Sequence, residues 1–394
     1  MDTDDSMNAR LQDALALLKD YGKGAMEQHQ GTLPRLPIPS LEQSMEDFLR
    51  SCKPLLTEEQ FATTQAKADA FMLSLGPKLH AELLEYDKDP ARNSYLEEFW
   101  EDAYLTARNS IVINTNPFFV LEDDPTPART SQIARATTLV AASLKFCQSV
   151  RKATLEPDMS RTTPLCMSQY PKLFGTTRIP RRVRDEVVFS PTSRNIVVMC
   201  RGQMYSVDVF DEQGELSISE ATLGSTLRAI RQHSMSLTFQ ACVESAVGLL
   251  TSENRDRWAD LREELAQKSA NNVEWLRMID EAVLVLNLDD TTPTTPAQMA
   301  QVALHGTSNV NPIKGSGITA GVQVGTCINR WYDKSLQIIV CQNGAAGINF
   351  EHSVVDGHTV LRFCSDVFTE TILAFAESIR GGFQARASAG AQVS

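Results

Sequence analysis

The stretch LQIIVCQNGAAGINFEHSVVDG, residues 336–357, decides the fold. Residues 336–341 are almost all apolar and rich in β-branched side chains, which is typical of a strand buried on both faces of a sheet. Asn343-Gly344 signals a turn, and residues 347–352 read as a second strand. Apolar residues then recur at helical spacing over 358–379. The sequence therefore predicts strand, turn, strand and helix, with a histidine at the end of the second strand.

Strands and helices continue on the N-terminal side of this stretch. One apolar face predicts a long amphipathic helix over 131–152, and alternating residues predict a hairpin over 195–210 that turns at Arg201-Gly202. Further helical patterns cover 220–233, 252–268 and 272–284. The region 289–325 is rich in Thr, Pro, Gly, Ser and Asn and has almost no periodicity, so we expect a long functional or mobile loop there.

The N-terminal part is predicted to be helical and is divided by prolines. We expect a partly disordered helix over 1–32. Three prolines within 33–39 fix φ and forbid a helix or an inner strand, so this segment must run extended over a surface. The segment that follows, through residue 90, reads as helical, with Thr57 and Gln60 forming a capping box.

Composition excludes several classes of protein. The 394 residues carry a net charge of −12, which argues against nucleic acid as a partner. A hydrophobic fraction of 42% is enough for a sizeable core and excludes a mainly disordered chain. The longest apolar runs, such as 282–288, are far shorter than the roughly 18 residues that a membrane-spanning helix needs. We therefore expect a soluble protein without a transmembrane segment.

The cysteines and the termini bear on the compartment. The eight cysteines are scattered, with no CxxC pair and no secretory signal, so we expect reduced thiols and no four-cysteine zinc site. Asp2, Asp4 and Asp5 precede the first basic residue, Arg10, whereas a mitochondrial presequence is basic. The C-terminal AQVS is not a peroxisomal tripeptide. The cytoplasm is the default location, with mitochondria and peroxisomes as alternatives.

His352 is the residue whose position suggests catalysis. It precedes Asp356 by four residues and Gly357 by five. A turn can bring the carboxylate back towards the imidazole, and Gly357 allows backbone angles that a Cβ would forbid. One ring nitrogen is then fixed while the other accepts a substrate proton. On its own, however, an HxxxDG pattern is more often a core histidine followed by an Asp-Gly turn.

Metal binding is a weaker interpretation of the same stretch. Its possible ligands are Glu351, His352, Asp356 and His358. Adjacent strand residues point to opposite faces, so at most two or three of these side chains could converge. We expect no metal site.

Other segments offer further weak candidates. A basic run is interrupted by an Ile-Pro pair and followed by two acids; its arginines are Arg178, Arg181, Arg182 and Arg184. It reads as a solvated loop, with a phosphate contact as the alternative. The glycines within 315–321 do not form a phosphate loop, because neither a GKS/T ending nor a preceding strand is present. Trp100 and Tyr104 lie on a predicted helix, where aromatic residues are more often core than ligand contacts.

Longer segments resemble a known family. RWYDKSLQ (330–337), Asn343-Gly344 and EHSVVDG (351–357) together resemble the active-site signature of the carnitine/choline acyltransferases. LPRLPIPSLEQSMEDF (33–48) resembles the other signature of that family, with Phe48 where Leu or Tyr is usual. Segments in between follow in family order, so the resemblance covers roughly residues 30 to 380. In detail the chain is most similar to the fungal type of carnitine O-acetyltransferase.

This resemblance implies a fold and a reaction. The family fold is α/β, with two domains that each have a mixed β-sheet flanked by helices, of the coenzyme A-dependent acyltransferase type. Its members transfer an acyl group reversibly between coenzyme A and the hydroxyl of carnitine or choline. By resemblance, His352 is the general base, Asp356 orients or stabilises the charged imidazole, and Tyr104 matches a position associated with the carnitine pocket. The resemblance implies no metal and no bound cofactor, since coenzyme A or acetyl-CoA is a co-substrate.

The chain also departs from the family. Members continue well past the helix that follows the histidine, and their second half carries contacts to the reacting centre, carnitine and coenzyme A. The resemblance therefore implies the N-terminal half of the fold, in four parts. These are an N-terminal helix at 1–32, a helical segment at 33–90 that would pack on the missing second domain, the catalytic-histidine domain at 91–380 and a disordered tail at 381–394.

Three hypotheses for the function follow from these observations. The leading one is an incomplete carnitine O-acetyltransferase-like enzyme that moves an acetyl or short acyl group, with carnitine and acyl-CoA as its small-molecule partners. The second is an inactive truncated remnant that acts, if at all, as a protein-binding module. The third, another coenzyme A-dependent acyltransferase that shares only HxxxDG, does not explain residues 33–48 or 330–344. Under the first two, we expect the exposed domain face to cause self-association.

Overall fold

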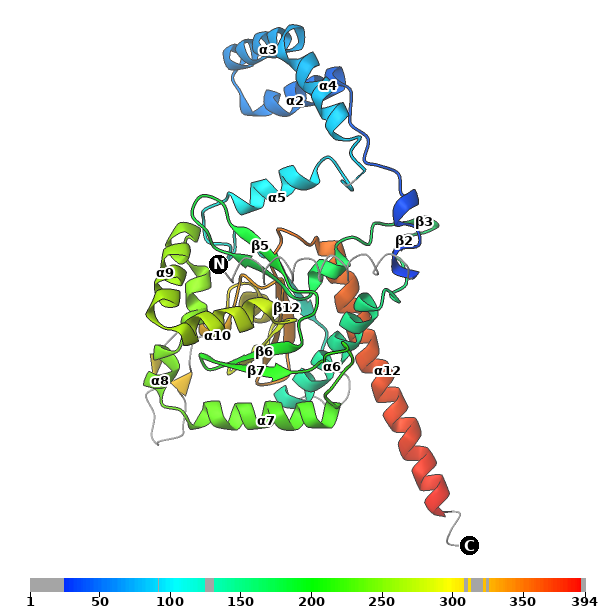
Figure 1. Cartoon of the computed structure of the whole chain (residues 1–394), viewed down its shortest axis with the longest axis vertical. Helices are drawn as coiled ribbons and strands as arrows, with labels where there is room; N and C mark the ends of the chain where they lie inside the picture. Colours follow the sequence, from blue (N-terminus) through cyan, green and yellow to red (C-terminus); the bar gives the residue numbers. More distant parts are fainter. Residues whose placement is uncertain are drawn as a thin grey trace, which may run out of the picture. The chain divides into compact units, whose positions relative to one another are not determined.

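The computed structural model describes residues 25–90, 92–124, 131–307, 311–312, 322–323 and 326–390 (Figure 1). The chain divides into two compact units, Thr32–Ala103 and a larger unit of Tyr104–Ser394 with Met1–Gly31. Most of the helix predicted over 1–32 lies outside the described residues. Its described part forms two short 3₁₀ helices, η1 (Ala25–Glu27) and η2 (Gln30–Thr32).

A mixed six-stranded sheet forms the centre of the larger unit. Its strands are, in spatial order, β1 (Phe118–Leu121), β12 (Ala346–Phe350), β11 (Leu336–Cys341), β8 (Val285–Asp289), β6 (Asn195–Cys200) and β7 (Gln203–Asp208). The pairs β11–β8 and β8–β6 are parallel, and the remaining pairs are antiparallel. The fold is therefore the mixed α/β arrangement that the family resemblance implied.

Both predicted hairpins are confirmed. β6 and β7 are joined at Arg201 and Gly202, which have φ of +53° and +77°, as a tight turn between antiparallel strands requires. β11 and β12 are joined through Gly344, whose φ is +85°. β11 coincides with the strand predicted over 336–341.

Helices cover both faces of this sheet, because successive strand residues point to opposite sides. Ile338 and Val340 of β11 belong to a core that also contains side chains of α6 (Gln132–Arg151), α7 (Glu220–Ser236) and α12 (Gly357–Gly390). On the other face, Ile339 packs with α11 (Pro296–Leu304). The same face of β6 packs with two further helices, α9 (Arg255–Lys268) and α10 (Ala270–Glu281). Figure 1 shows α9 and α10 on the side of the sheet away from α6 and α12.

The remaining elements of the larger unit are short. The strands are β2 (Met159–Ser160), β3 (Thr163–Pro164), β4 (Thr176–Ile179), β5 (Glu186–Phe189), β9 (Asn311–Pro312) and β10 (Val322–Gln323). The helices are η5 (Tyr170–Leu173), α8 (Phe239–Glu244), η6 (Val247–Ser252) and η7 (Thr326–Asn329). β4 and β5 form an antiparallel hairpin apart from the central sheet, and this hairpin contributes to the site described below.

Two predicted boundaries differ from the structure. The region 289–325 was expected to be a loop, but its described part contains α11, which begins at a Thr295 cap with Pro296 in the first turn. The nine residues of α11 are too few to show periodicity above the Thr- and Pro-rich background. At the C-terminus, α12 continues to Gly390, whereas the sequence predicted a disordered tail from residue 381.

The smaller unit is helical, as the sequence predicted. It contains α2 (Leu41–Cys52), η3 (Lys53–Leu55), α3 (Glu58–Leu73), α4 (Leu75–Tyr86) and most of α5 (Glu97–Leu105). The capping box of Thr57 and Gln60 is confirmed at the start of α3. Among the described residues of this unit only Ala68 and Gly76 are buried, while Leu55 and Leu73 are more than four-fifths exposed. The unit therefore presents apolar side chains to solvent. None of the helices in the described ranges is long and apolar enough to span a membrane.

We predict that the end of β8 is stabilised by the ion pair between Asp289 and Arg330. Both side chains are fully buried, and the two carboxylate oxygens accept hydrogen bonds of 2.9 and 2.6 Å from Arg330. Asp289→Asn leaves the guanidinium without its counter-charge and should lower the free energy of unfolding in urea by about 3–5 kcal/mol. Glu281→Gln removes one of the two partly exposed ion-pair partners of Arg277 and should cost less than about 1 kcal/mol. Equal effects of the two substitutions would contradict the assignment.

Candidate active site

His352 lies two residues after the end of β12 and is half-buried. Its ring stacks on that of Tyr104, in the last turn of α5, with centroids 5.4 Å apart and an interplanar angle of 15°. Phe350, the last residue of β12, lies 5.8 Å from the same imidazole in a tilted arrangement. The structure thus brings together two of the three predicted site residues, from segments almost 250 positions apart in the chain.

Glu351 fixes the backbone on both sides of this imidazole. One carboxylate oxygen, Oε1, accepts a 3.1 Å hydrogen bond from Nη1 of Arg178. The other, Oε2, accepts hydrogen bonds from the backbone N–H and the hydroxyl of Ser353. Because Glu351 and Ser353 flank His352 and are both buried, the histidine backbone is held at two points.

Arg178, on β4, is the residue about which the sequence prediction was wrong. It was expected in a solvated loop, but it is 1% exposed. Its Nε donates to Asp185 and its Nη2 donates to the backbone carbonyl of Tyr104, each over 2.7 Å. The other arginines of the run, Arg181, Arg182 and Arg184, are exposed as predicted.

A second layer of charges lies behind Arg178. Asp185 also accepts a 2.7 Å hydrogen bond from Arg255, and Arg255 donates to Asp333 over 2.6 Å. Burial opposes ionisation of Asp185, but Arg255 and Arg178 still hold its pKa below the usual value. Burial raises the pKa of Asp333, against the pull of Arg255 and of a hydrogen bond from Trp258. The network links the β4–β5 hairpin to α9 and to the segment that precedes β11.

Asp356, the third predicted residue, is exposed at the start of α12. Its carboxylate accepts a 2.7 Å hydrogen bond from the backbone N–H of Gly357, and its own N–H donates to Gln169 over 2.7 Å. Burial raises the pKa of Tyr104, and the negative charges of Glu351 and Asp356 raise it further. The charge of Asp356 therefore acts on the ring that stacks on His352.

Sequence reasoning missed the buried carboxylate of Asp158, which anchors the start of α12. It accepts hydrogen bonds from Tyr170 and Arg362, and Nε2 of His358 lies 3.3 Å from it. His358 was a member of the possible metal set, and the structure instead places it beside Asp158. Within the described ranges, no group of three or more His, Cys, Asp or Glu side chains is arranged to hold a metal ion.

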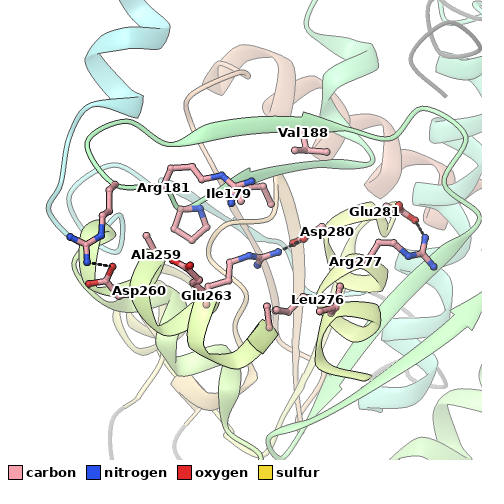
Figure 2. A pocket seen from close by; sticks show the side chains of 15 residues that line it. Ile179, Arg181, Val188, Ala259, Asp260, Glu263, Leu276, Arg277, Asp280 and Glu281 are labelled. Carbon is pink, nitrogen blue, oxygen red and sulfur yellow. Dashed lines mark hydrogen bonds and ion pairs between the residues drawn. The ribbon is translucent and has the colours of Figure 1, made fainter. Parts of the chain in front are cut away.

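A separate cavity of about 640 Å³ lies between the β4–β5 hairpin and helices α9 and α10 (Figure 2). Its lining is rich in ion pairs, which are Arg182–Asp260, Arg262–Asp280 and Arg277–Glu281. Burial raises the pKa of Asp280 to about 6, against the pull of Arg262 and Lys334. The lining includes neither His352 nor Tyr104, so the cavity is distinct from the candidate active site.

Lys334 is fully buried. It contacts Asp280, which lies 54 positions earlier in the chain. Its ammonium donates to the backbone carbonyls of Ile279 and Asp280 and to the hydroxyl of Thr177. Burial lowers the pKa of Lys334 to about 7, although the negative charge of Asp280 opposes the shift.

We predict from Lys334 that the stability of the protein rises with pH above about 7. Between pH 7 and its ordinary pKa of 10.5, the unfolded chain binds a proton on Lys334 that the folded chain has lost, so raising the pH favours the folded state. Lys334→Met should remove this rise when the free energy of unfolding in urea is measured from pH 7 to pH 10. Lys268→Met, at an exposed lysine of α9, should retain it. An unchanged pH slope in Lys334→Met would refute the lowered pKa.

Comparison with known proteins adds to this geometry. Residues 36–388 match the family model described as Choline/Carnitine o-acyltransferase. The chain is 39% identical over 380 residues to a Saccharomyces cerevisiae protein assigned as a mitochondrial carnitine O-acetyltransferase, covering 88% of this chain and 54% of that protein. It is 36% identical to rat mitochondrial carnitine O-palmitoyltransferase 2, covering 87% of this chain and 53% of the relative.

Two further matches have lower sequence identity to this chain. Bovine peroxisomal carnitine O-octanoyltransferase is 31% identical over 350 residues, covering 86% of this chain and 53% of the relative. A solved chloramphenicol acetyltransferase aligns with 70% of this chain and 92% of its own, but 11% identity and a TM-score of 0.29 are too low to support a functional conclusion. The chain spans about half the length of the curated relatives it matches.

Proposed function

The chain belongs to the choline/carnitine O-acyltransferase family, and from that premise we propose that it supplies the general base for acyl transfer between coenzyme A and the hydroxyl of carnitine. The observation that carries the proposal is the position of His352. It is a half-buried imidazole at a strand end, stacked on an aromatic ring and flanked by two anchored residues. Such a group can meet a substrate proton in a defined orientation, as general base catalysis requires.

The proposed step moves one proton and one acyl group. His352 takes the proton of the carnitine hydroxyl while the oxygen attacks the acyl carbonyl of acyl-CoA. The carbon–sulfur bond then breaks, and the imidazolium returns the proton to the coenzyme A thiolate. In the reverse direction the thiol is deprotonated and the carnitine oxygen leaves. The exchange uses no covalent acyl-enzyme, no metal and no redox cofactor.

Asp356 and Tyr104 assist this step in the proposal. The imidazole becomes positively charged during the reaction, and the exposed carboxylate of Asp356, on the same loop, favours that charge. Tyr104 supports the imidazole through ring stacking and, at the position that the resemblance associates with carnitine, contributes to the carnitine pocket.

Acetyl, or another short acyl group, is the substrate that we propose. Its support is the Saccharomyces cerevisiae relative assigned as an acetyltransferase, which has the highest of the identities given above. The names of the palmitoyl and octanoyl transferases make longer acyl chains the direct alternative. Because the relatives are named mitochondrial or peroxisomal, we propose one of these organelles as the location of the protein, with the cytoplasm as the alternative.

We predict that acetyl transfer requires His352. The assay is the formation of acetylcarnitine from acetyl-CoA by the purified chain, alone and mixed with the separately expressed C-terminal half of the yeast relative. His352→Ala should lower the rate by about 10²- to 10⁴-fold, which is the usual contribution of a general base. His233→Ala should leave it unchanged, since that histidine is exposed on α7.

The same assay separates this proposal from the alternative of an inactive remnant that binds another protein. Transfer that appears only on mixing supports an enzyme that needs both halves. Absence of transfer under both conditions supports the remnant.

We also propose, under either interpretation, that the protein self-associates through the exposed apolar side chains of the smaller unit. Sedimentation at increasing protein concentration measures this self-association.

We further predict that the ring of Tyr104, more than its hydroxyl, supports the base. Tyr104→Phe keeps the stacked ring and should change kcat by less than about twofold. Tyr104→Ala removes the stack, and the loss of an aromatic pair worth about 0.5–1.5 kcal/mol should lower kcat by about two- to tenfold. Equal values of kcat for the two variants would contradict the proposal that ring stacking by Tyr104 supports His352.

A further inference from the structure

We propose that Arg178 is a positioning residue that holds the imidazole of His352 in its reactive orientation. This inference rests on the proposed function, because it assigns a second residue to the same reaction. It concerns a side chain that the sequence pattern had placed in solvent and that no comparison identifies.

Three nitrogens of one guanidinium reach three different parts of the site. Nη1 donates to Glu351 over 3.1 Å, Nη2 donates to the carbonyl of Tyr104 over 2.7 Å, and Nε donates to Asp185 over 2.7 Å. Glu351 precedes the histidine in the chain, and the ring of Tyr104 stacks on it. Arg178 therefore holds the residue that precedes His352 and the backbone of Tyr104, whose ring lies against the imidazole.

The chemistry of arginine explains why this position needs a guanidinium. Its planar fork directs several N–H groups outward in fixed directions, so it can bind separate acceptors at once. A lysine at position 178 would keep the charge but concentrate it on a single nitrogen, which cannot reach Glu351, Tyr104 and Asp185 together.

Burial makes the arrangement rigid. The side chains of Arg178 and Asp185 are fully buried and that of Glu351 is 2% exposed, so these charges have little water to replace a lost partner. The second oxygen of Glu351 is committed to Ser353, on the far side of the histidine. A shift of Arg178 would therefore displace Glu351 and, through the bond of Glu351 to Ser353, also Ser353. These are the two residues that flank His352.

Orientation is the property that such a network controls. A base must meet the substrate proton at hydrogen-bond distance, and displacement of a reacting group by about 1 Å can cost about 10²-fold in rate. Arg178 does not need to touch substrate to have this effect, since it acts through Glu351 and Tyr104.

The test measures the imidazole directly and does not depend on turnover. The chain is prepared with ring-¹³C-labelled histidine, and the spectrum of the His352→Gln variant assigns one of the six histidine signals to His352. In Arg178→Lys we expect the His352 signal to move and its pH titration to change, while those of His80 and His233 stay. In the transfer assay with the second half, we expect kcat to fall by about 10²-fold with a smaller change in KM for acetyl-CoA.

Arg182→Lys is the matched control, because Arg182 belongs to the same basic run but forms an exposed ion pair with Asp260. It should change neither the His352 signal nor kcat. If Arg178→Lys does not fold, Glu351→Gln takes its place, since it weakens the bond from Arg178 while keeping the shape of the side chain. A folded Arg178→Lys or Glu351→Gln with the wild-type His352 signal and titration would overturn the proposal. If the signal moves but the wild-type chain shows no transfer under any condition, the positioning holds and the proposed function fails.

Discussion

A charge buried in a protein must be paired, and the candidate active site depends on this constraint. Leaving one member of a buried ion pair uncompensated costs about 3–5 kcal/mol. Arg178, with Asp185 and Glu351 as its partners, lies almost wholly out of water. Pairing these groups ties the β4–β5 hairpin to the end of β12, so that the loop carrying His352 is fixed by the same contacts that stabilise the fold.

The same constraint applies to residues 330–337, which belong to the segment that resembles the family signature. Arg330 pairs with Asp289 at the end of β8, and Asp333 pairs with Arg255 on α9. Lys334 is enclosed by backbone carbonyls. These signature residues are fully buried, so they organise the interior behind the reacting groups. The residues proposed to act on substrate, His352 and Tyr104, are only partly buried. In this chain, the segment that resembles the family signature thus combines buried charged residues with a partly exposed histidine.

Much of the fold could be predicted from the sequence because it depends on local patterns. The apolar run at 336–341, the Asn343-Gly344 turn and the helix over 131–152 each carry their signal within a few neighbouring residues. Arg178 could not be placed in the same way. Its hydrophilic neighbours suggested solvent, while its acidic partner Glu351 lies 173 positions away, and no local pattern records such a pairing. The position of His352 at a strand end was predicted, but its stacking on Tyr104 appears only in three dimensions. The resemblance identified both residues without giving that contact.

Chemical rescue of His352→Gly by free imidazole distinguishes a histidine that acts as a base from one that only supports the fold. If His352 is the general base, this variant, mixed with a second half from the family, forms almost no acetylcarnitine, and added imidazole restores part of the rate. Imidazole should not change the rate of His233→Gly. Acetyl transfer by His352→Gly at the wild-type rate, without imidazole, would contradict the assignment of His352 as the general base.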